Sequence, residues 1–219
     1  GSGKFGNAVV LTGASGSKAT FPSAAGNLGK AFSVSVWVKW GNSGANPDWK
    51  RILENRQSND TSKGFLIYTS SSTKLHLKSG NINSDRGVTA DWKNGNWVHM
   101  VTAIENGMVS TYGDGSFIGT DDINPVANST SNLTLGSEVG GGSRWNGAVD
   151  DLRLYDRPLT QSEVTIIYGG GNGDFVSVSA GNSVSIKKAG SVTLTAHAPA
   201  TASMNAATLV DKTITVSKA

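Results

Sequence analysis

Several tryptophan and tyrosine residues stand beside basic side chains, at places where the chain is expected to turn. The 219 residues include 6 Trp and 4 Tyr, and Trp49 is followed directly by Lys50 and Arg51. Tyr68 lies close in sequence to a basic segment around His76. Flat aromatic rings stack on the C–H-rich faces of sugars, and a few polar groups then hold the hydroxyls. The pattern therefore predicts a surface that binds carbohydrate.

The segment Lys74-Leu75-His76-Leu77-Lys78 alternates between polar and apolar residues. In a strand, such alternation places all the polar side chains on one face. We expect that face to line the ligand, with Arg51 and Lys78 placed to meet an acidic polysaccharide. The full set of expected ligand contacts is Trp49, Arg51, Tyr68, His76, Lys78, Trp92 and Trp145.

Short strands must position these side chains. Residues 32–40 alternate with period two, so that Phe32, Val34, Val36 and Val38 share one face. Comparable strand-like runs occur at 8–11, 64–68, 74–78, 97–104, 108–112, 133–136 and 148–155. Asn106-Gly107 stands between two of these runs and supplies the positive φ angles of a hairpin turn. The sequence therefore predicts an all-β fold.

One helix interrupts this pattern. Thr160 and Glu163 have the spacing of a capping box, and Val164, Ile167 and Tyr168 follow as an apolar stripe. The spacing predicts a short helix over residues 160–168. A glycine-rich run at 169–173 follows, and beyond it, from residue 176, the composition changes to alternating Val, Ser and Thr. We therefore expect a first domain over 1–170, a linker over 171–175 and a separate β module over 176–219.

Composition and charge exclude some classes of function. The net charge is +3, with a basic excess over residues 39–93 and an acidic excess over 100–175. No concentrated basic face is apparent, so nucleic-acid binding is not expected. No apolar run approaches the roughly 20 residues of a membrane span, so membrane insertion is not expected either. The chain has no cysteine, which is common in exported bacterial proteins.

Six motifs in sequence order resemble those of laminin-G-like domains, in the concanavalin A-like, pentraxin-related bacterial group. They lie at residues 5–11, 31–39, 96–101, 112–115, 133–136 and 145–160. The resemblance implies two curved antiparallel sheets packed face to face as a jelly-roll sandwich, with a short C-terminal β extension. The last segment, from Gly190 to Val216, resembles the C-terminal half of bacterial Ig-like repeats.

The resemblance also implies a structural Ca²⁺ ion. In these domains an aspartate of the closing strand and oxygens near the first strand hold the ion. Asp150 matches that aspartate, Asp151 stands beside it, and Asn7 lies in the first motif. Ca²⁺ takes six to eight oxygen ligands. One departure weakens the expectation, because the usual pair of aspartates after the first strand is replaced here by Ser17-Lys18.

Catalysis is not expected from this chain. Jelly-roll glycosidases similar to these domains need two neighbouring carboxylates, usually on one strand. The four glutamates, Glu54, Glu105, Glu138 and Glu163, are scattered along the sequence. We therefore expect a non-catalytic carbohydrate-binding module of a secreted or cell-surface bacterial protein, with a polysaccharide-degrading domain elsewhere in the polypeptide. The alternative is a structural or adhesive module with protein partners, which the C-terminal segment favours.

Overall fold

The computed structural model describes residues 1–41, 48–56, 63–70, 74–79, 82–84, 86–89 and 95–170, and the backbone of four strands beyond them. The chain divides into two compact units, Gly1–Gly171 and Asn172–Ala219. The first unit holds every residue that the sequence analysis singled out for ligand or metal contact.

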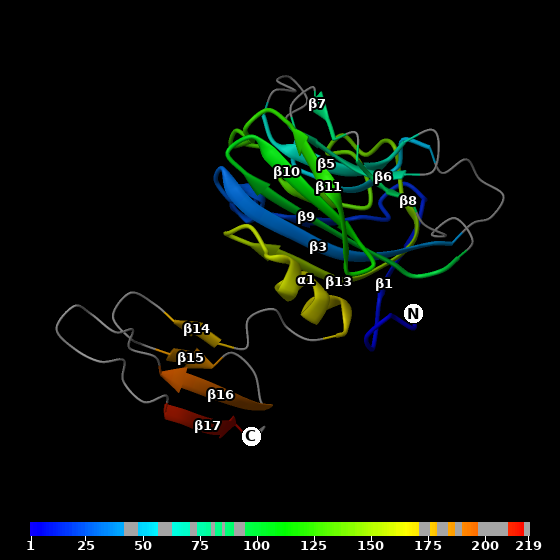
Figure 1. Ribbon diagram of the computed structural model, residues 1–219. Helices are drawn as coiled ribbons and strands as arrows, with labels where there is room; N and C mark the ends of the chain where they lie inside the picture. The colour runs from blue at the N-terminus through cyan, green and yellow to red at the C-terminus, as the bar shows by residue number, and fades with distance from the viewer. Residues whose placement is uncertain are drawn as a thin grey trace. The chain divides into compact units, whose positions relative to one another are not determined.

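Two antiparallel sheets form the first unit (Figure 1). The six-stranded sheet has the order β1 (Val9–Thr12), β13 (Asn146–Tyr155), β3 (Ala31–Trp40), β9 (Val98–Glu105), β10 (Met108–Gly113) and β11 (Ser116–Asp122). The seven-stranded sheet has the order β2 (Ala19–Phe21), β12 (Leu133–Leu135), β4 (Arg51–Glu54), β5 (Phe65–Thr69), β6 (Lys74–Ser79) and β7 (Ile82–Asn83), and β8 (Val88–Thr89) also pairs with β6. A 3-10 turn, Ser23–Gly26, follows β2. The predicted all-β jelly-roll sandwich is confirmed.

The core lies between the two sheets, where the alternating residues of β3 meet those of β5 and β6. Phe32 packs against Phe65 with ring centroids 5.2 Å apart. Leu75 and Leu77 of β6 are fully buried in the same cluster, as the alternation predicts. The positive φ angles of Asn106 and Gly107 confirm the predicted hairpin turn between β9 and β10.

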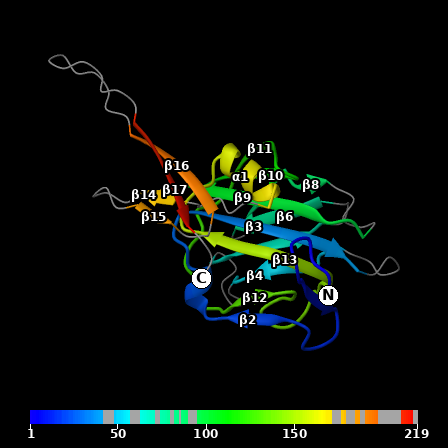
Figure 2. The ribbon, with the colours of Figure 1, turned by 90° about the horizontal axis from the view of Figure 1, so that it is seen from below.

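The helix α1 (Gln161–Tyr168) covers the outer face of the six-stranded sheet (Figures 1 and 2). Thr160 and Glu163 make the predicted capping box. Val164 and Ile167 pack with Val101 of β9 and other residues of that face. Because the chain's own helix covers much of this face, the outer face of the seven-stranded sheet becomes the stronger candidate for a ligand.

The second unit contains two antiparallel strand pairs. β14 (Val176–Val178) pairs with β15 (Val184–Ile186), and β16 (Gly190–Ala196) pairs with β17 (Val210–Val216). The likeness of this unit to an Ig-like repeat, and the exact domain limits, stay predictions. Across the described part of the chain, no helix combines the length and the apolar character needed to cross a bilayer.

Candidate functional site

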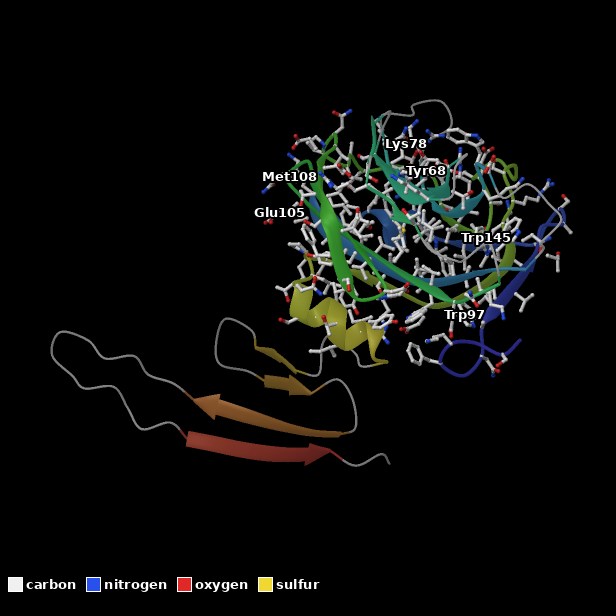
Figure 3. All side chains as sticks on the ribbon, turned by 45° about the vertical axis from the view of Figure 1, so that its right-hand side comes forward. Tyr68, Lys78, Trp97, Glu105, Met108 and Trp145 are labelled. Carbon is white, nitrogen blue, oxygen red and sulfur yellow. The ribbon has the colours of Figure 1, made fainter. Side chains whose placement is uncertain are left out.

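The outer face of the seven-stranded sheet brings five of the predicted ligand contacts together. Arg51 of β4 is in register with Tyr68 of β5, and Tyr68 is in register with His76 of β6. Lys78 lies two residues along β6 on the same face, and Figure 3 shows it close to Tyr68. Trp49 stands immediately before β4. Residues from three neighbouring strands thus converge on one patch, which we call the Trp49 face.

Trp49 forms the exposed platform of this patch. Its indole stacks on Tyr68 at 5.6 Å between ring centroids and 16° between planes, and 51% of the residue remains exposed. Its backbone φ is 61°, and its N–H donates to the carbonyl oxygen of Thr69 on β5 at 2.8 Å. The ring is therefore fixed on one side and open to solvent on the other, which is the arrangement that sugar stacking requires.

Tyr68 supports the platform from beneath. It is 2% exposed, and its hydroxyl donates to Asn83 Oδ1 at 2.9 Å. Burial raises the pKa of the Tyr68 phenol, so the hydroxyl stays protonated at neutral pH. The Arg51 guanidinium carbon lies 5.3 Å from the centre of the Tyr68 ring, a cation–π contact.

His76 serves as a second support rather than as an open ligand group. Its Nδ1 lies 2.8 Å from the carbonyl oxygen of Ser84, and its Nε2 lies 2.9 Å from Ser70 Oγ. A carbonyl oxygen only accepts hydrogen bonds, so Nδ1 donates to Ser84. The ring also packs on Tyr68 at 5.8 Å. Both nitrogens are thus engaged within the protein.

Two carboxylates that sequence reasoning missed flank Arg51. Arg51 Nε lies 3.5 Å from Glu54 Oε2, and its Nη2 lies 3.5 Å from Glu138 Oε1. Arg56 Nε pairs with the other oxygen of Glu54 at 3.4 Å. Burial raises the pKa of Glu54, and the two arginines act against that rise. A register shift in β4 brings Arg51 and Glu54 to the same face. The sequence contains no pattern from which this shift could be predicted.

Lys78 adds a further cation to the Trp49 face. Burial lowers the pKa of its ammonium, and the charges of Arg56 and Arg51 lower it further. Within the described residues, no carboxylate pairs with it. An excess of positive charge among the described residues of this face favours a negatively charged ligand.

The two remaining predicted contacts do not join this patch. Trp145 is fully buried in the core, where it packs edge-on against Trp40 at 5.0 Å. Its expected ligand contact is corrected, because no surface of its ring is open to a ligand. A tryptophan beside a turn can face inwards or outwards, and the opposite sheet decides which. Trp92 lies outside the described residues.

The residues predicted to hold Ca²⁺ make contacts within the chain. Asp150 Oδ2 accepts from the Phe5 N–H at 2.8 Å, and Asp150 Oδ1 accepts from the Asp151 N–H at 2.8 Å. Asp151 Oδ1 pairs with Arg153 Nε at 2.7 Å. Asn7 pairs with Ser2 in an isolated bridge. Across the described residues, no three His, Asp or Glu side chains cluster as a metal site. Backbone amides and a guanidinium thus contact three of the four carboxylate oxygens, and the fourth, the buried Asp151 Oδ2, has no hydrogen-bond partner among the described residues. The calcium site stays a prediction.

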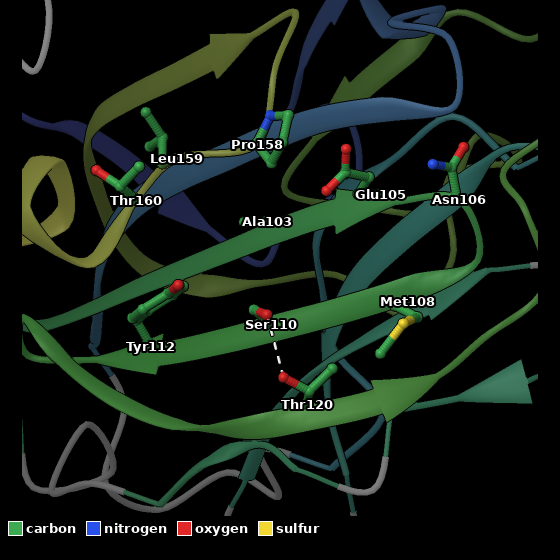
Figure 4. A pocket seen from close by; sticks show the side chains of 10 residues that line it. All are labelled: Ala103, Glu105, Asn106, Met108, Ser110, Tyr112, Thr120, Pro158, Leu159 and Thr160. Carbon is green, nitrogen blue, oxygen red and sulfur yellow. Dashed lines mark hydrogen bonds between the residues drawn. The ribbon is translucent and has the colours of Figure 1, made fainter.

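A separate hollow of about 490 Å³ lies on the outer face of the six-stranded sheet, beside the segment that leads into α1 (Figure 4). Met108 and Glu105 stand at its exposed side, and Ser110 shares a 3.2 Å hydrogen bond with Thr120 at its floor. No residue predicted to contact ligand lines it. We therefore place the candidate site on the Trp49 face.

Comparisons with known structures agree with this fold. Domain 4 of AbnA, a GH43 extracellular arabinanase from Geobacillus stearothermophilus solved with arabinotriose, superposes with a TM-score of 0.60 at 23% identity, over 77% of this chain and 79% of that domain. The CBM40 of the Ruminococcus gnavus IT-sialidase, bound to α2,3-sialyllactose, superposes with a TM-score of 0.57 at 13% identity, over 74% and 97% of the two chains. A SAP-like pentraxin from Limulus polyphemus gives a TM-score of 0.51 at 20% identity, over 81% and 90%. These similarities concern the fold.

Sequence comparison identifies the family. The adhesion G-protein coupled receptor V1 of Danio rerio is 27% identical over 143 residues, which are 61% of this chain but only 2% of the receptor. Residues 12–165 match the laminin-G family described as the Concanavalin A-like lectin/glucanases superfamily. That match spans both sheets and the start of α1. The chain therefore belongs to the Concanavalin A-like lectin/glucanases superfamily.

Proposed function

We propose that this chain is a non-catalytic carbohydrate-binding module and that the Trp49 face is its binding surface. The observation that carries the proposal is the half-exposed indole of Trp49, which is fixed over Tyr68. A rigid aromatic plane of this kind offers a sugar ring a large contact area without the entropy cost of ordering a mobile side chain.

The charge of the Trp49 face favours an acidic polysaccharide. Arg51, Arg56 and Lys78 outnumber the two carboxylates among them, and Lys78 has no carboxylate partner within the described residues. A uronate or sulfate group held near the stacked sugar would compensate that charge. The fold is compatible with such a role, since structural neighbours were solved with arabinotriose and with sialyllactose.

The two glutamates of the Trp49 face support a binding role better than a catalytic one. A glycosidase needs one carboxyl that delivers a proton to the leaving group and a second that acts on the sugar carbon. Here Arg51 lies against both Glu54 and Glu138, and Glu54 is buried. We infer that both carboxylates hold Arg51 in place.

The same reasoning extends to the protein's setting. We infer a secreted or surface-exposed bacterial protein in which this module accompanies a polysaccharide-degrading domain. The extracellular arabinanase of Geobacillus stearothermophilus, which contains a domain of this fold, supports that setting.

Affinity electrophoresis tests the proposed function. The chain should be retarded in gels that contain an acidic polysaccharide, with dissociation constants of about 10⁻⁴ to 10⁻⁶ M, because an open sheet face buries little area per sugar. Retardation should weaken as salt rises, since exposed charges are screened over about 10 Å at 0.1 M. A correctly folded chain that migrates unchanged in neutral, uronate and sulfated polysaccharides alike would refute the proposal.

One observation favours a second function. The matched segment of the zebrafish adhesion receptor shows a related sequence inside a very large protein. A structural or adhesive module with protein partners would fit that relationship, and the β strands of the second unit are compatible with a continuing array. The electrophoresis experiment decides between the two functions, because this alternative predicts no retardation by any polysaccharide.

A further inference from the structure

A second polar hollow, of about 320 Å³, lies where two loops meet at an end of the sandwich. One loop joins β1 to β2 and contributes residues 14–18, and the other joins β12 to β13 and contributes residues 137, 140, 141 and 144. We call this space the Lys18/Arg144 hollow. It is distinct from the Trp49 face, although the β12–β13 loop reaches both, since the Arg51 N–H donates to Ser143 O at 2.8 Å.

The lining of the Lys18/Arg144 hollow carries two cations and no carboxylate. Within the described residues, neither the Lys18 ammonium nor the Arg144 guanidinium has an ion pair or a side-chain hydrogen bond. Glu138 belongs to the same loop, but its carboxylate pairs with Arg51 at 3.5 Å and accepts from Ser143 Oγ at 2.6 Å. Two like charges therefore line one concave space, and no carboxylate among the lining residues offsets them.

The rest of the lining consists of small residues with hydrogen-bond donors. Ser17 Oγ accepts from the Thr12 N–H at 2.9 Å, which leaves its own O–H as a donor. Ser15 adds a second hydroxyl. Because these side chains are small, a ligand can come close to the backbone of both loops.

Gly140 lines the hollow without a packing role. A Cβ at this position would meet nothing within 4 Å, so no neighbouring group requires a glycine. Its φ is not in the left-handed region either, unlike that of Gly16 or Gly141. A glycine that neither packing nor backbone conformation demands leaves the peptide accessible from the hollow.

We propose that the Lys18/Arg144 hollow binds an oxyanion: a sulfate, phosphate or carboxylate group, either free or carried by a saccharide. The guanidinium of Arg144 offers two parallel N–H donors to such a group, and the Lys18 ammonium adds charge from the facing loop. Serine hydroxyls and the N–H groups of the loop peptides add further donors, and no carboxylate among the lining residues repels an anion. The site depends on neither Trp49 nor the stacking of a sugar.

Amide chemical shifts followed during a sodium sulfate titration test the proposal, with sodium chloride at equal ionic strength as the reference. The amides of residues 14–18 and 140–144 should shift and saturate with sulfate and should barely respond to chloride. Lys18→Met and Arg144→Met should each weaken sulfate binding about tenfold. Lys30→Met is the matched control, because Lys30 is also an exposed lysine but does not line the hollow. The proposal would be overturned by shifts that do not saturate, by shifts that chloride reproduces, or by shifts that persist when Lys18→Met and Arg144→Met are combined in one chain.

A second titration identifies the source of the oxyanion. If a sulfated or uronate oligosaccharide saturates the same amides at lower concentration than sulfate, and its neutral counterpart does not, the group is carried by a glycan. If only the inorganic ion saturates them, the site takes the free anion. Repeating the sulfate titration with Trp49→Ala separates this site from the proposed function, because sulfate binding should persist in that variant.

Discussion

Trp49 adopts a backbone conformation that side chains rarely occupy. Its φ of 61° lies in the left-handed region, where the Cβ of any residue other than glycine crowds the following carbonyl. The hydrogen bond from its N–H to Thr69 and the stack on Tyr68 hold it there. Strain of this kind persists where the surrounding structure enforces it, and it is common at ligand-binding sites.

A comparison of two substitutions measures that strain. Trp49→Gly should unfold with a free energy about 1 kcal/mol higher than Trp49→Ala, because glycine accepts the left-handed region without cost. Urea denaturation of both variants gives the difference. Equal stabilities, or a more stable alanine variant, would show that the turn is not strained.

His99 is a buried histidine that the structure keeps neutral. Its Nε2 lies 2.8 Å from Ser35 Oγ, and its ring stacks on Trp37 at 4.9 Å. Burial lowers the pKa of His99 to about 4, and the charge of Arg153 adds to that lowering. The unfolded chain titrates near 6.5.

This depressed pKa predicts a loss of stability in acid. Between pH 6.5 and pH 4 the unfolded chain gains a proton at His99 that the folded chain lacks, so the free energy of unfolding falls as pH falls through this window. The part due to His99 is present in full above pH 6.5 and is about 3 kcal/mol. Urea unfolding at pH 7 and pH 4.5 should show a smaller loss for His99→Gln than for the unchanged chain. Equal losses would mean that another group controls the acid response.

At the scale of elements, a bulge in β13 ties the first segment of the chain to the sandwich. The register between β13 and β3 shifts between Asp150 and Arg153, and Asp151 has a φ of 47°. The bulge directs the Asp150 carboxylate at the Phe5 N–H. A β-bulge changes the direction of the side chains next to it. This irregularity therefore allows Asp150 to accept a hydrogen bond from Phe5, which is 145 residues away in sequence.

Asp150→Ala should therefore destabilise the fold by about 1–3 kcal/mol through the loss of hydrogen bonds to a carboxylate. The melting temperature of the unchanged chain should be the same in calcium and in EDTA, since the Phe5 and Asp151 N–H groups hold the Asp150 carboxylate without a metal ion. A calcium-dependent rise in melting temperature that disappears in Asp150→Ala would contradict this expectation. It would establish the calcium site that the family resemblance implies.

Sequence reasoning succeeded for elements whose signal is local. The alternation over residues 32–40 predicted which side of β3 enters the core, and the capping box predicted α1. Ser33, Ser35 and Trp37 lie on the opposite face of β3, and all three are buried as well. The helix α1, the segment before it and the N-terminal segment around Phe5 cover this face. Because these segments are distant in sequence, the residues of the strand alone do not predict that they cover it.

The candidate site could be predicted only in part. The Tyr68, His76 and Lys78 positions followed from strand periodicity, because neighbouring strands of opposite direction place them on one face. Trp49 and Trp145 looked alike in sequence, but one stacks in solvent and the other lies in the core. The carboxylates around Arg51 were missed, because Glu138 comes from a loop 87 residues away.

At the scale of the whole molecule, the division into two compact units predicts that the first unit folds alone. A chain that ends at Gly171 should keep the free energy of unfolding of the sandwich within about 0.5 kcal/mol. Circular dichroism and urea unfolding of the shortened chain test this. An unfolded or strongly destabilised product would place the second unit within the first core.

The most direct test of the account compares two aromatic substitutions on opposite sheets. Trp49 and Phe117 have exposed fractions of 51% and 54%, and each packs on a tyrosine, at 5.6 Å and 5.5 Å. Titration calorimetry with the best polysaccharide from the electrophoresis screen should show that Trp49→Ala weakens binding at least about tenfold, or 1.4 kcal/mol. Phe117→Ala should leave the dissociation constant unchanged, and both variants should remain folded. Equal affinities for the two variants, or a greater loss for Phe117→Ala, would show that the Trp49 face is not the carbohydrate-binding surface.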